Sequence, residues 1–340
     1  MTARGEVAAH LAWLLAWSAV AAMGALAITQ ALGLGSRGPL PALQSLTPLV
    51  LLPAFPIAVV AALRNRRALA LTAAGVAVAL LVLAAPIAFP GHRPAVAADA
   101  TRLRVTFANL FRENQDPSAA AAVMAHDADV VAVVELNPVM AAHLEAAATA
   151  AGRYRYQLAQ PTFGSDGLAL YSRFPIVSAD VRPIGTRLGL EAHLDVDGQP
   201  VRLFVVHPFP PIFNGRLSAE WAMSLATIGD EATSPGPPTI VVGDFNASRW
   251  HPPFRRLLRR GLRDSHEWLG HGFSTSWPND WATPPFVRLD HALVDRGATA
   301  RASRPASSRR TSVRRRPPAR RRGRSRSRRR PARRSRSGPR

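Results

Sequence analysis

The first 90 residues alternate long apolar stretches with short polar loops. The apolar stretches occupy about residues 10–30, 46–63 and 68–89. A helix of about 20 residues crosses a hydrocarbon core roughly 30 Å thick, so the first and third stretches are long enough to span a bilayer. The second stretch is shorter and contains Pro53 and Pro56, and we expect it to form a kinked span or a re-entrant hairpin. The pattern therefore predicts a multi-pass transmembrane region at residues 1–90.

The basic residues beside these stretches predict an orientation in the cell membrane. Arg64, Arg66 and Arg67 lie between the second and third stretches, whereas the first loop contains only Arg37. Arg-rich loops tend to remain in the cytoplasm, so the chain beyond the third stretch is expected on the extracytoplasmic side, although Arg residues soon after this stretch oppose that orientation. A cleaved signal peptide is the alternative for the first stretch; the absence of a clear cleavage pattern and the two apolar stretches that follow favour a span.

A Pro-, Gly- and Ala-rich linker at 91–101 precedes a domain at 102–295 with mixed strand and helix patterns. Alternating or continuous apolar runs predict strands at 103–108, 129–134, 167–172, 190–196, 201–207, 238–243 and 288–294. Amphipathic patterns predict helices at 117–126, 137–150, 215–231 and 252–260. Such a mixture, with polar residues at the strand ends, is typical of a layered α/β or α+β sandwich whose site lies along one edge.

The apolar pattern disappears near the C-terminus. Residues 301–340 contain 19 of the 43 basic residues, with no acidic residue and no His. Because like charges repel and few apolar side chains are available, we expect residues 296–340 to form a disordered Arg/Ser/Pro-rich tail. A shifted reading frame, a polycationic arm for nucleic acid or anionic lipid, and a degenerate pseudoenzyme would each produce such a tail.

Composition changes this picture in two ways. The net charge of +21 is mainly due to the tail, because residues 1–300 contain 24 Arg against 22 acidic residues. A basic nucleic-acid-binding face therefore cannot be inferred from the total charge. The chain contains no Cys, which excludes disulfides and thiolate zinc sites.

Polar residues with useful chemistry follow or begin several predicted strands. They are Asn109, Glu135, His207, Asp244, Asn246 and Asp290. Taken singly, a Glu after a strand is usually a solvated strand end, and Gly-Asp-Phe-Asn is usually a turn with an Asx hydrogen bond. Taken together, several carboxylates on one edge would repel one another unless a hard cation lay among them, and oxygen ligands suit Mg²⁺. The pattern indicates metal-dependent chemistry on a phosphate ester.

The order of these residues resembles the endonuclease/exonuclease/phosphatase superfamily, which includes deoxyribonuclease I, apurinic endonucleases, sphingomyelinases and inositol polyphosphate 5-phosphatases. The resemblance covers residues 102–295. It lies in Asn109-Leu110-Phe111, Glu135, Tyr171–Ile176, His207-Pro208, Gly243-Asp244-Phe245-Asn246 and Arg288-Leu289-Asp290-His291. The resemblance implies a four-layered α/β sandwich of the deoxyribonuclease I-like type. It also implies hydrolysis of a phosphate ester with Mg²⁺ or Mn²⁺.

The resemblance also implies a role for each matching residue. Glu135 would be the leading metal ligand, with Asn109 assisting. Asp244 would activate or position the attacking water, and Asn246 would contact the phosphate oxygens. His207 would bind the phosphate or act as general acid, which an imidazole with a pKa near 6.5 can do.

The C-terminal part departs from the superfamily's pattern. Asp290 is expected to belong to the catalytic set, but a Ser-Asp-His element that follows it in the superfamily is missing, since the last His is His291 and the last acid is Asp295. Neighbouring side chains in a strand point to opposite faces, so we expect His291 to face away from the site and to be a poor replacement. Loss of a general imidazole commonly lowers a rate by about 10²–10⁴, so impaired catalysis is expected.

Two further residues have open interpretations. Arg173 is expected to form a salt bridge rather than to contact phosphate, and Trp277 would either line the substrate cleft or pack in the core. The leading hypothesis is a membrane-tethered phosphodiesterase acting on nucleic acid or another phosphodiester. The alternatives are a phospholipid or phosphomonoester phosphatase, and an inactive membrane-anchored protein that binds through its Arg-rich tail. We expect a monomer whose partners are the lipid bilayer and the substrate.

Overall fold

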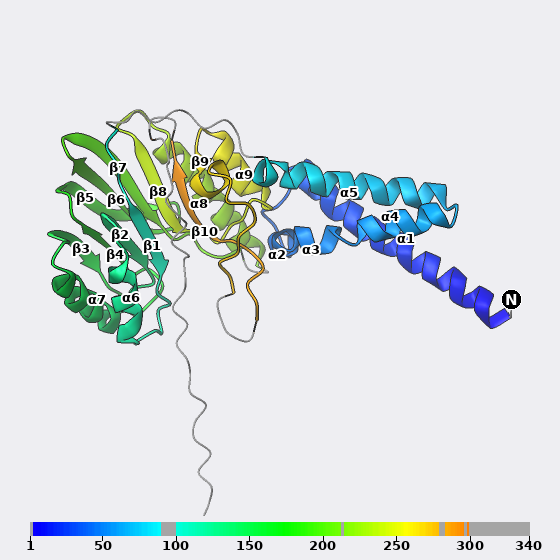
Figure 1. Cartoon of the computed structure of the whole chain (residues 1–340), viewed down its shortest axis with the longest axis horizontal. Helices are drawn as coiled ribbons and strands as arrows, with labels where there is room; N and C mark the ends of the chain where they lie inside the picture. Colours follow the sequence, from blue (N-terminus) through cyan, green and yellow to red (C-terminus); the bar gives the residue numbers. More distant parts are fainter. Residues whose placement is uncertain (1–2, 90–99, 212–213, 279–282, 296–297, 299–340) are drawn as a thin grey trace, which may run out of the picture.

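The computed structural model describes residues 3–89, 100–211, 214–278, 283–295 and 298. A long helical arm, residues 3–89, extends from a globular domain (Figure 1). Nearly all of the expected linker at 91–101 and of the expected tail at 296–340 falls outside the described residues, and those two expectations stay predictions.

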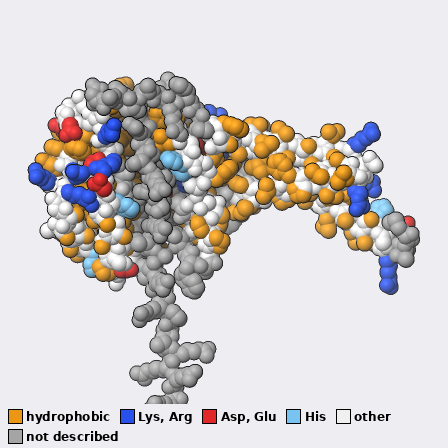
Figure 2. Space-filling model, viewed as in Figure 1, with side chains coloured by type: hydrophobic (Ala, Val, Ile, Leu, Met, Phe, Trp, Pro, Cys, Tyr) orange, Lys and Arg blue, Asp and Glu red, His pale blue; other side chains and the backbone are white. Residues whose placement is uncertain are grey.

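The arm is built from the three apolar stretches. Its helices are α1 (Ala3–Ala31), α2 (Leu40–Ser45), α3 (Thr47–Leu51), α4 (Ala54–Leu63) and α5 (Arg67–Ala88). The second stretch is interrupted between α3 and α4, next to Pro53, as its two prolines predicted. Among the described helices, α1 and α5 are long and apolar enough to cross a membrane, which is weak evidence of membrane association. Hydrophobic side chains cover the visible face of the arm (Figure 2).

Two β-sheets form the centre of the domain. The first has the order β1-β2-β4-β3, with β1 (Val105–Asn109), β2 (Val130–Val134), β3 (Tyr156–Gln160) and β4 (Leu168–Ser172). The second has the order β5-β6-β7-β8-β10-β9, with β5 (Ile176–Ile184), β6 (Arg187–Val196), β7 (Gln199–Val206), β8 (Thr239–Asp244), β9 (Arg263–Asp264) and β10 (Asp290–Val294). Sequence patterns missed β3, β5 and β9.

Helices cover the outer faces of both sheets, which gives the predicted four layers. On the first sheet lie α6 (Pro117–Ala125) and α7 (Pro138–Ala151), and on the second lie α8 (Gly215–Ala232) and α9 (Pro252–Arg259). The short helix α10 (Ser265–Trp268) follows β9. Alternation along β2 explains the layering: Val131 and Val133 face the helices of the first sheet, whereas Ala132 packs between the sheets.

The strand directions bring the predicted site residues to one edge. β1 runs parallel to β2, with Asn109 opposite Val134, and β7 runs parallel to β8. β8 and β10 are antiparallel, and Asp290 lies opposite Asp244. The carboxyl ends of β1, β2, β7 and β8 and the start of β10 therefore meet at this edge, which we call the rim.

Candidate active site

Asn109 connects two carboxylates that belong to different sheets. Its amide nitrogen donates to Glu135 Oε1 at 2.9 Å and to Asp244 Oδ2 at 3.0 Å. Its amide oxygen accepts from the backbone N–H of Phe111 at 3.0 Å. Because the Phe111 N–H needs an acceptor, this contact fixes which end of the amide faces the carboxylates. With its amide nitrogen toward the carboxylates, Asn109 orients Glu135 and Asp244. The expectation that it assists as a metal ligand stays a prediction.

Glu135 is held in a sparsely populated backbone conformation directly after β2. Its φ is +55°, and Phe111 and Asn246 have φ of +60° and +47°. The other described non-glycine residues with positive φ are only Asn65 and Asp197. Such conformations cost energy and tend to occur at functional sites, and here three of the five lie on the rim. The backbone N–H of Arg112 donates to Glu135 Oε2 at 3.1 Å, which fixes the carboxylate further.

His207 follows β7 and faces Glu135. Its Nδ1 donates to the carbonyl of Ser165 at 3.2 Å, and its Nε2 lies 3.6 Å from Glu135 Oε1. The Ser165 carbonyl accepts a hydrogen bond from Nδ1–H, so Nε2 is the ring nitrogen left facing the carboxylate. The imidazole is buried apart from 7% of its surface. It can therefore exchange a proton or a hydrogen bond with a group that enters beside Glu135.

The loop that holds His207 in place packs tightly under the rim. The Thr162 N–H donates to the Leu136 carbonyl at 2.9 Å, and the Leu136 N–H donates to the Gly167 carbonyl at 3.0 Å. A Cβ atom at Gly167 would lie 1.9 Å from the Leu136 oxygen, so only Gly fits there. This close approach fixes the loop that carries Ser165 relative to Glu135.

Asp244 ends β8 and is completely buried. Its Oδ1 accepts from the backbone N–H of Asn246 at 2.9 Å, an Asx turn that closes the strand. The Asn246 side chain donates to the Pro208 carbonyl at 2.9 Å, so it connects the end of β8 to the residue after His207. Asn246 thus lies where the sequence placed it, while its amide nitrogen is turned toward the backbone.

Asp290 begins β10 and is 8% exposed. The Ser276 hydroxyl accepts from the backbone N–H of Leu289 and of Asp290 at 3.0 and 3.3 Å, which fixes the entry to the strand. The adjacent Trp277 packs edge-to-face against Phe286 and stays 38% exposed, so it combines packing with a partly open surface.

The donor set fits a hard divalent cation. The carboxylates of Glu135 and Asp244 share one amide donor, so they lie close together, and Asp290 lies opposite Asp244 in the sheet. Like charges held this close favour a counter-ion between them, and carboxylate oxygens are the ligands that Mg²⁺ and Mn²⁺ prefer. Among the described residues, no group of three or more Asp, Glu or His meets the spacing of a preformed metal site. The fit therefore rests on a small carboxylate set of the kind that Mg²⁺ completes with water and substrate.

His291 faces away from the rim, as the strand alternation predicted. Its ring is buried against Phe254, with ring centroids 4.3 Å apart, and its Nδ1 donates to Asp264 at 2.6 Å. Burial and the nearby Arg288 lower the pKa of His291. His291 therefore belongs to the layer between the second sheet and its helices and lies away from the carboxylates of the rim.

A buried charge cluster around Asp264 was not predicted. Burial raises the pKa of Asp264, but two hydrogen bonds from Arg288, at 2.7 and 3.1 Å, and the neighbouring His291 outweigh it, so the pKa lies well below its usual range. Burial and Asp264 raise the pKa of Glu267 to about 7, against the opposing effect of Arg249 and Arg288. The sequence signal was the Asp-Ser-His-Glu run at 264–267, which is typical of a helix N-cap.

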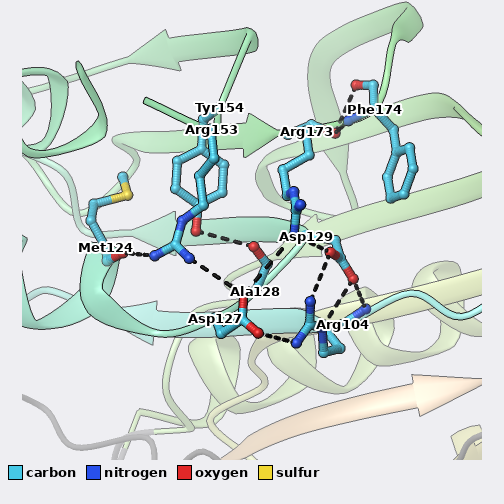
Figure 3. Close-up of polar contacts among 10 residues, drawn as sticks. Arg104, Met124, Asp127, Ala128, Asp129, Arg153, Tyr154, Arg173 and Phe174 are labelled. Atoms are coloured by element: carbon cyan, nitrogen blue, oxygen red, sulfur yellow. Dashed lines mark hydrogen bonds and ion pairs between the residues drawn. The ribbon is translucent and has the colours of Figure 1, made fainter. Parts of the chain in front are cut away.

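Arg173 lies at the other end of the first sheet. It donates to Asp129 Oδ1 at 2.9 Å, and the backbone N–H of Arg104 donates to Asp129 Oδ2 at 2.8 Å (Figure 3). Asp129 and Glu135 flank β2, so six residues, or roughly 20 Å of extended chain, separate this cluster from the rim. The predicted salt bridge of Arg173 is confirmed.

The chain is similar to a known protein family and to several solved structures. The Endonuclease/Exonuclease/phosphatase family model matches residues 97–309. No curated protein sequence matches the chain. Similar solved structures include a beta hairpin deletion mutant of beta toxin from Staphylococcus aureus (16% identity, 61% of this chain and 90% of that chain, TM-score 0.46). A second is humanized D. rerio TDP2 (20% identity, 58% of this chain and 85% of that chain, TM-score 0.48). A third is the 3' phosphatase NExo from Neisseria bound to product DNA hairpin (18% identity, 57% of this chain and 87% of that chain, TM-score 0.45).

The family match begins before β1 and extends past β10, so it includes both sheets and every residue of the rim. It covers well over half of the chain, which therefore belongs to the endonuclease/exonuclease/phosphatase family, a family of hydrolases that act on phosphate esters.

Proposed function

We propose that the chain is a metal-dependent phosphoesterase that hydrolyses phosphodiesters and is tethered to a membrane by its helical arm. The observation that supports this most is the bridge from Asn109 to Glu135 and Asp244, with His207 Nε2 3.6 Å from Glu135. The bridge unites carboxylates from two sheets at the end where four strands terminate. A site at strand ends on a layered scaffold is the usual place for catalysis in such folds.

Glu135 would hold the cation, with Asp244 and Asp290 beside it. When bound, Mg²⁺ or Mn²⁺ would neutralise charge that develops on the phosphoryl group. Asp244 would position the attacking water, and the hydrogen bonds from Asn246 and Asn109 to its two oxygens would hold the carboxylate in place for this role. When both of its ring nitrogens carry a proton, His207 would donate to a phosphate oxygen or to the leaving oxygen through Nε2.

The test compares variants of the full chain in detergent with a chromogenic phosphodiester and Mg²⁺. Glu135→Gln and Asp244→Asn preserve size and remove charge, and we expect each to lower kcat/KM by about 10³ or more. Asp180→Asn is the matched control, since Asp180 lies on β5 with a side chain 70% exposed. Chelation by EDTA should abolish turnover, and Mg²⁺ should restore it.

Two outcomes would defeat the proposal. One is a Glu135→Gln variant as active as the wild type. The other is no hydrolysis of DNA, sphingomyelin or the chromogenic diester, either by the chain as it stands or after a Ser-Asp-His element is restored to its C-terminus. The restored chain is needed because, among the described histidines, His207 is the one that contacts the carboxylates of the rim, and a low rate is expected without a second imidazole.

A phospholipid or a phosphomonoester is the second candidate substrate. Aromatic side chains beside the rim support it: Phe163 is 90% exposed, Phe111 44% and Phe209 36%. These residues belong to the segments after Asn109, around Ser165 and after His207. Exposed rings next to a site suit a substrate with an apolar part. Turnover of phospholipid vesicles compared with a DNA oligonucleotide distinguishes the two substrate classes.

A further inference from the structure

The loop 245–251 runs from the rim to the helical arm. It starts directly after Asp244 and leads into α9. On its rim side, the Phe245 N–H donates to the Leu289 carbonyl at 2.9 Å, and Trp221 Nε1 donates to the Phe245 carbonyl at 3.1 Å. On its far side, Trp250 packs in the hydrophobic core of the arm. One short segment thus contacts both the carboxylate cluster and the arm.

Arg255 joins this loop to the C-terminal end of α1. Its Nη1 donates to Gln30 Oε1 at 2.7 Å and to the carbonyls of Arg249 and Trp250 at 3.1 Å, and its Nη2 donates to the Gln30 carbonyl at 2.9 Å. Burial and neighbouring Arg residues lower the pKa of Arg255 to about 10. Among the described residues, no ion pair involves Arg255, so the Gln30 carbonyl at the negative end of the α1 dipole and the carbonyls of Arg249 and Trp250 stabilise its charge.

His251 and Arg256 make the same connection from neighbouring positions. His251 Nδ1 accepts from the Ser248 N–H at 2.8 Å, and its Nε2 donates to the Pro41 carbonyl at 2.8 Å. Burial lowers the pKa of His251 to about 4, in agreement with a neutral ring that accepts on one side and donates on the other. Arg256 donates to the Gly33 carbonyl at 2.8 Å.

We infer that the arm helps to position the rim. Arg255 and His251 are positioning residues: they fix loop 245–251 relative to α1 and Pro41. Through this loop they fix Asp244 and Asn246. This rests on the proposed function of the rim. A passive tether needs only a covalent connection, whereas these contacts fix the loop from outside the domain. A displacement of about 1 Å can lower a rate by about 10², so a loosened loop is expected to reduce turnover.

The experiment weakens the contacts from the side of the arm, far from the rim. Gln30→Leu removes the side-chain acceptor of Arg255, leaves the Gln30 backbone carbonyl in place, and also removes the Gln30 donor to Thr47 within the arm. Arg255→Met removes all the donors of the guanidinium. Thr72→Val is the control in the arm, because the exposed Thr72 hydroxyl, within the part of the chain that the structure describes, bonds only to the Ala68 carbonyl in its own helix. Arg259→Met is the control on α9, since the exposed Arg259 donates to the Arg255 carbonyl and not to the arm.

Hydrogen exchange of the amides in 245–251 is measured on the full chain in detergent. We expect both test variants to exchange at least about ten times faster than the wild type in this loop, with both controls unchanged. Equal exchange in the wild type and the test variants would overturn the inference. This measurement needs no catalytic activity. If the chain hydrolyses no substrate, the proposed function fails, and the exchange rates still decide whether the arm fixes the loop.

Kinetics with the soluble diester then test whether the loop positions the rim. We expect Gln30→Leu to lower kcat about tenfold with KM within about twofold, and Arg255→Lys to recover part of the loss in Arg255→Met. The double variant should be little worse than Arg255→Met alone, because the bond between Arg255 and Gln30 Oε1 is already broken in that variant. Faster exchange combined with an unchanged kcat would overturn the positioning role.

Discussion

Replacement of Asn109 separates two roles for this residue, donor to carboxylates and oxygen ligand to a metal. Asn109→Leu removes two hydrogen bonds to carboxylates, each worth about 1.5–3 kcal/mol. Glu135 keeps 13% of its side chain exposed, so water compensates part of the loss. We expect a decrease of about 3 kcal/mol in the free energy of unfolding, at the lower end of the sum.

Asn109→Asp removes the same donors and adds a charge. The introduced carboxyl would lie about 3 Å from the carboxylates of Glu135 and Asp244, where like charges repel by about 5 kcal/mol per pair at an effective dielectric constant of 20. This repulsion raises the pKa of the introduced carboxyl, and uptake of a proton then limits the cost. The folded variant then holds a proton that the unfolded chain has lost, so its stability falls by about 1.4 kcal/mol per pH unit as the pH rises from 5 toward the raised pKa.

The assay is urea unfolding of the full chain in detergent with EDTA, followed by tryptophan fluorescence at pH 5, 6.5 and 8. The loss of unfolding free energy relative to the wild type should be much larger at pH 8 than at pH 5 for Asn109→Asp. For Asn109→Leu this loss should be nearly the same at all three pH values. If Asn109 acted only as an oxygen ligand and not as a donor, Asn109→Leu would be nearly as stable as the wild type without metal, and Asn109→Asp would bind Mg²⁺ more tightly. A pH-independent Asn109→Asp would refute the bridge.

Two further predictions concern stability. A Cβ at Gly243 would lie 2.1 Å from the Val206 carbonyl oxygen, so Gly243→Ala should lower the free energy of unfolding by about 3 kcal/mol and reduce turnover. Gly164→Ala is the control and should change neither quantity, because its Cβ would make an ordinary contact of 4.0 Å. Equal effects of the two substitutions would contradict this prediction. Because burial lowers the pKa of His251 to about 4, the unfolded chain binds an extra proton below pH 6.5, and stability should fall by about 3 kcal/mol as the pH falls from 6.5 to 4. Urea unfolding across this range should show a shallower dependence for His251→Gln, and identical dependences would exclude His251 as the cause.

The sequence predicted the elements whose side chains have a clear periodicity. Helices α6 to α9 begin and end within two residues of the predicted bounds, because each has a Pro or an Asn near its start and a regular apolar face. β3 was missed because its residues are mostly exposed and show no alternation. β5 was missed for a similar reason, since much of it is exposed at the edge of its sheet.

The rim was predictable because its residues directly follow or begin buried strands. The bond partners were not, since a pattern along the chain does not tell which end of the Asn109 amide faces Glu135. The contacts of Arg255 with Gln30 were equally hidden: they join residues 225 positions apart, and an Arg on a surface helix is usually solvated.

The site lies across the boundary between the two sheets. Asn109 and Glu135 end strands of one sheet, Asp244 ends a strand of the other, and the 3.0 Å bond from Asn109 to Asp244 crosses from layer to layer. A small slide of one layer over the other would break that bond while every ladder within the sheets survived. Heating should therefore abolish activity at a temperature below that of global unfolding. Substitutions among the apolar side chains between the two sheets should likewise abolish activity while circular dichroism still shows an intact fold.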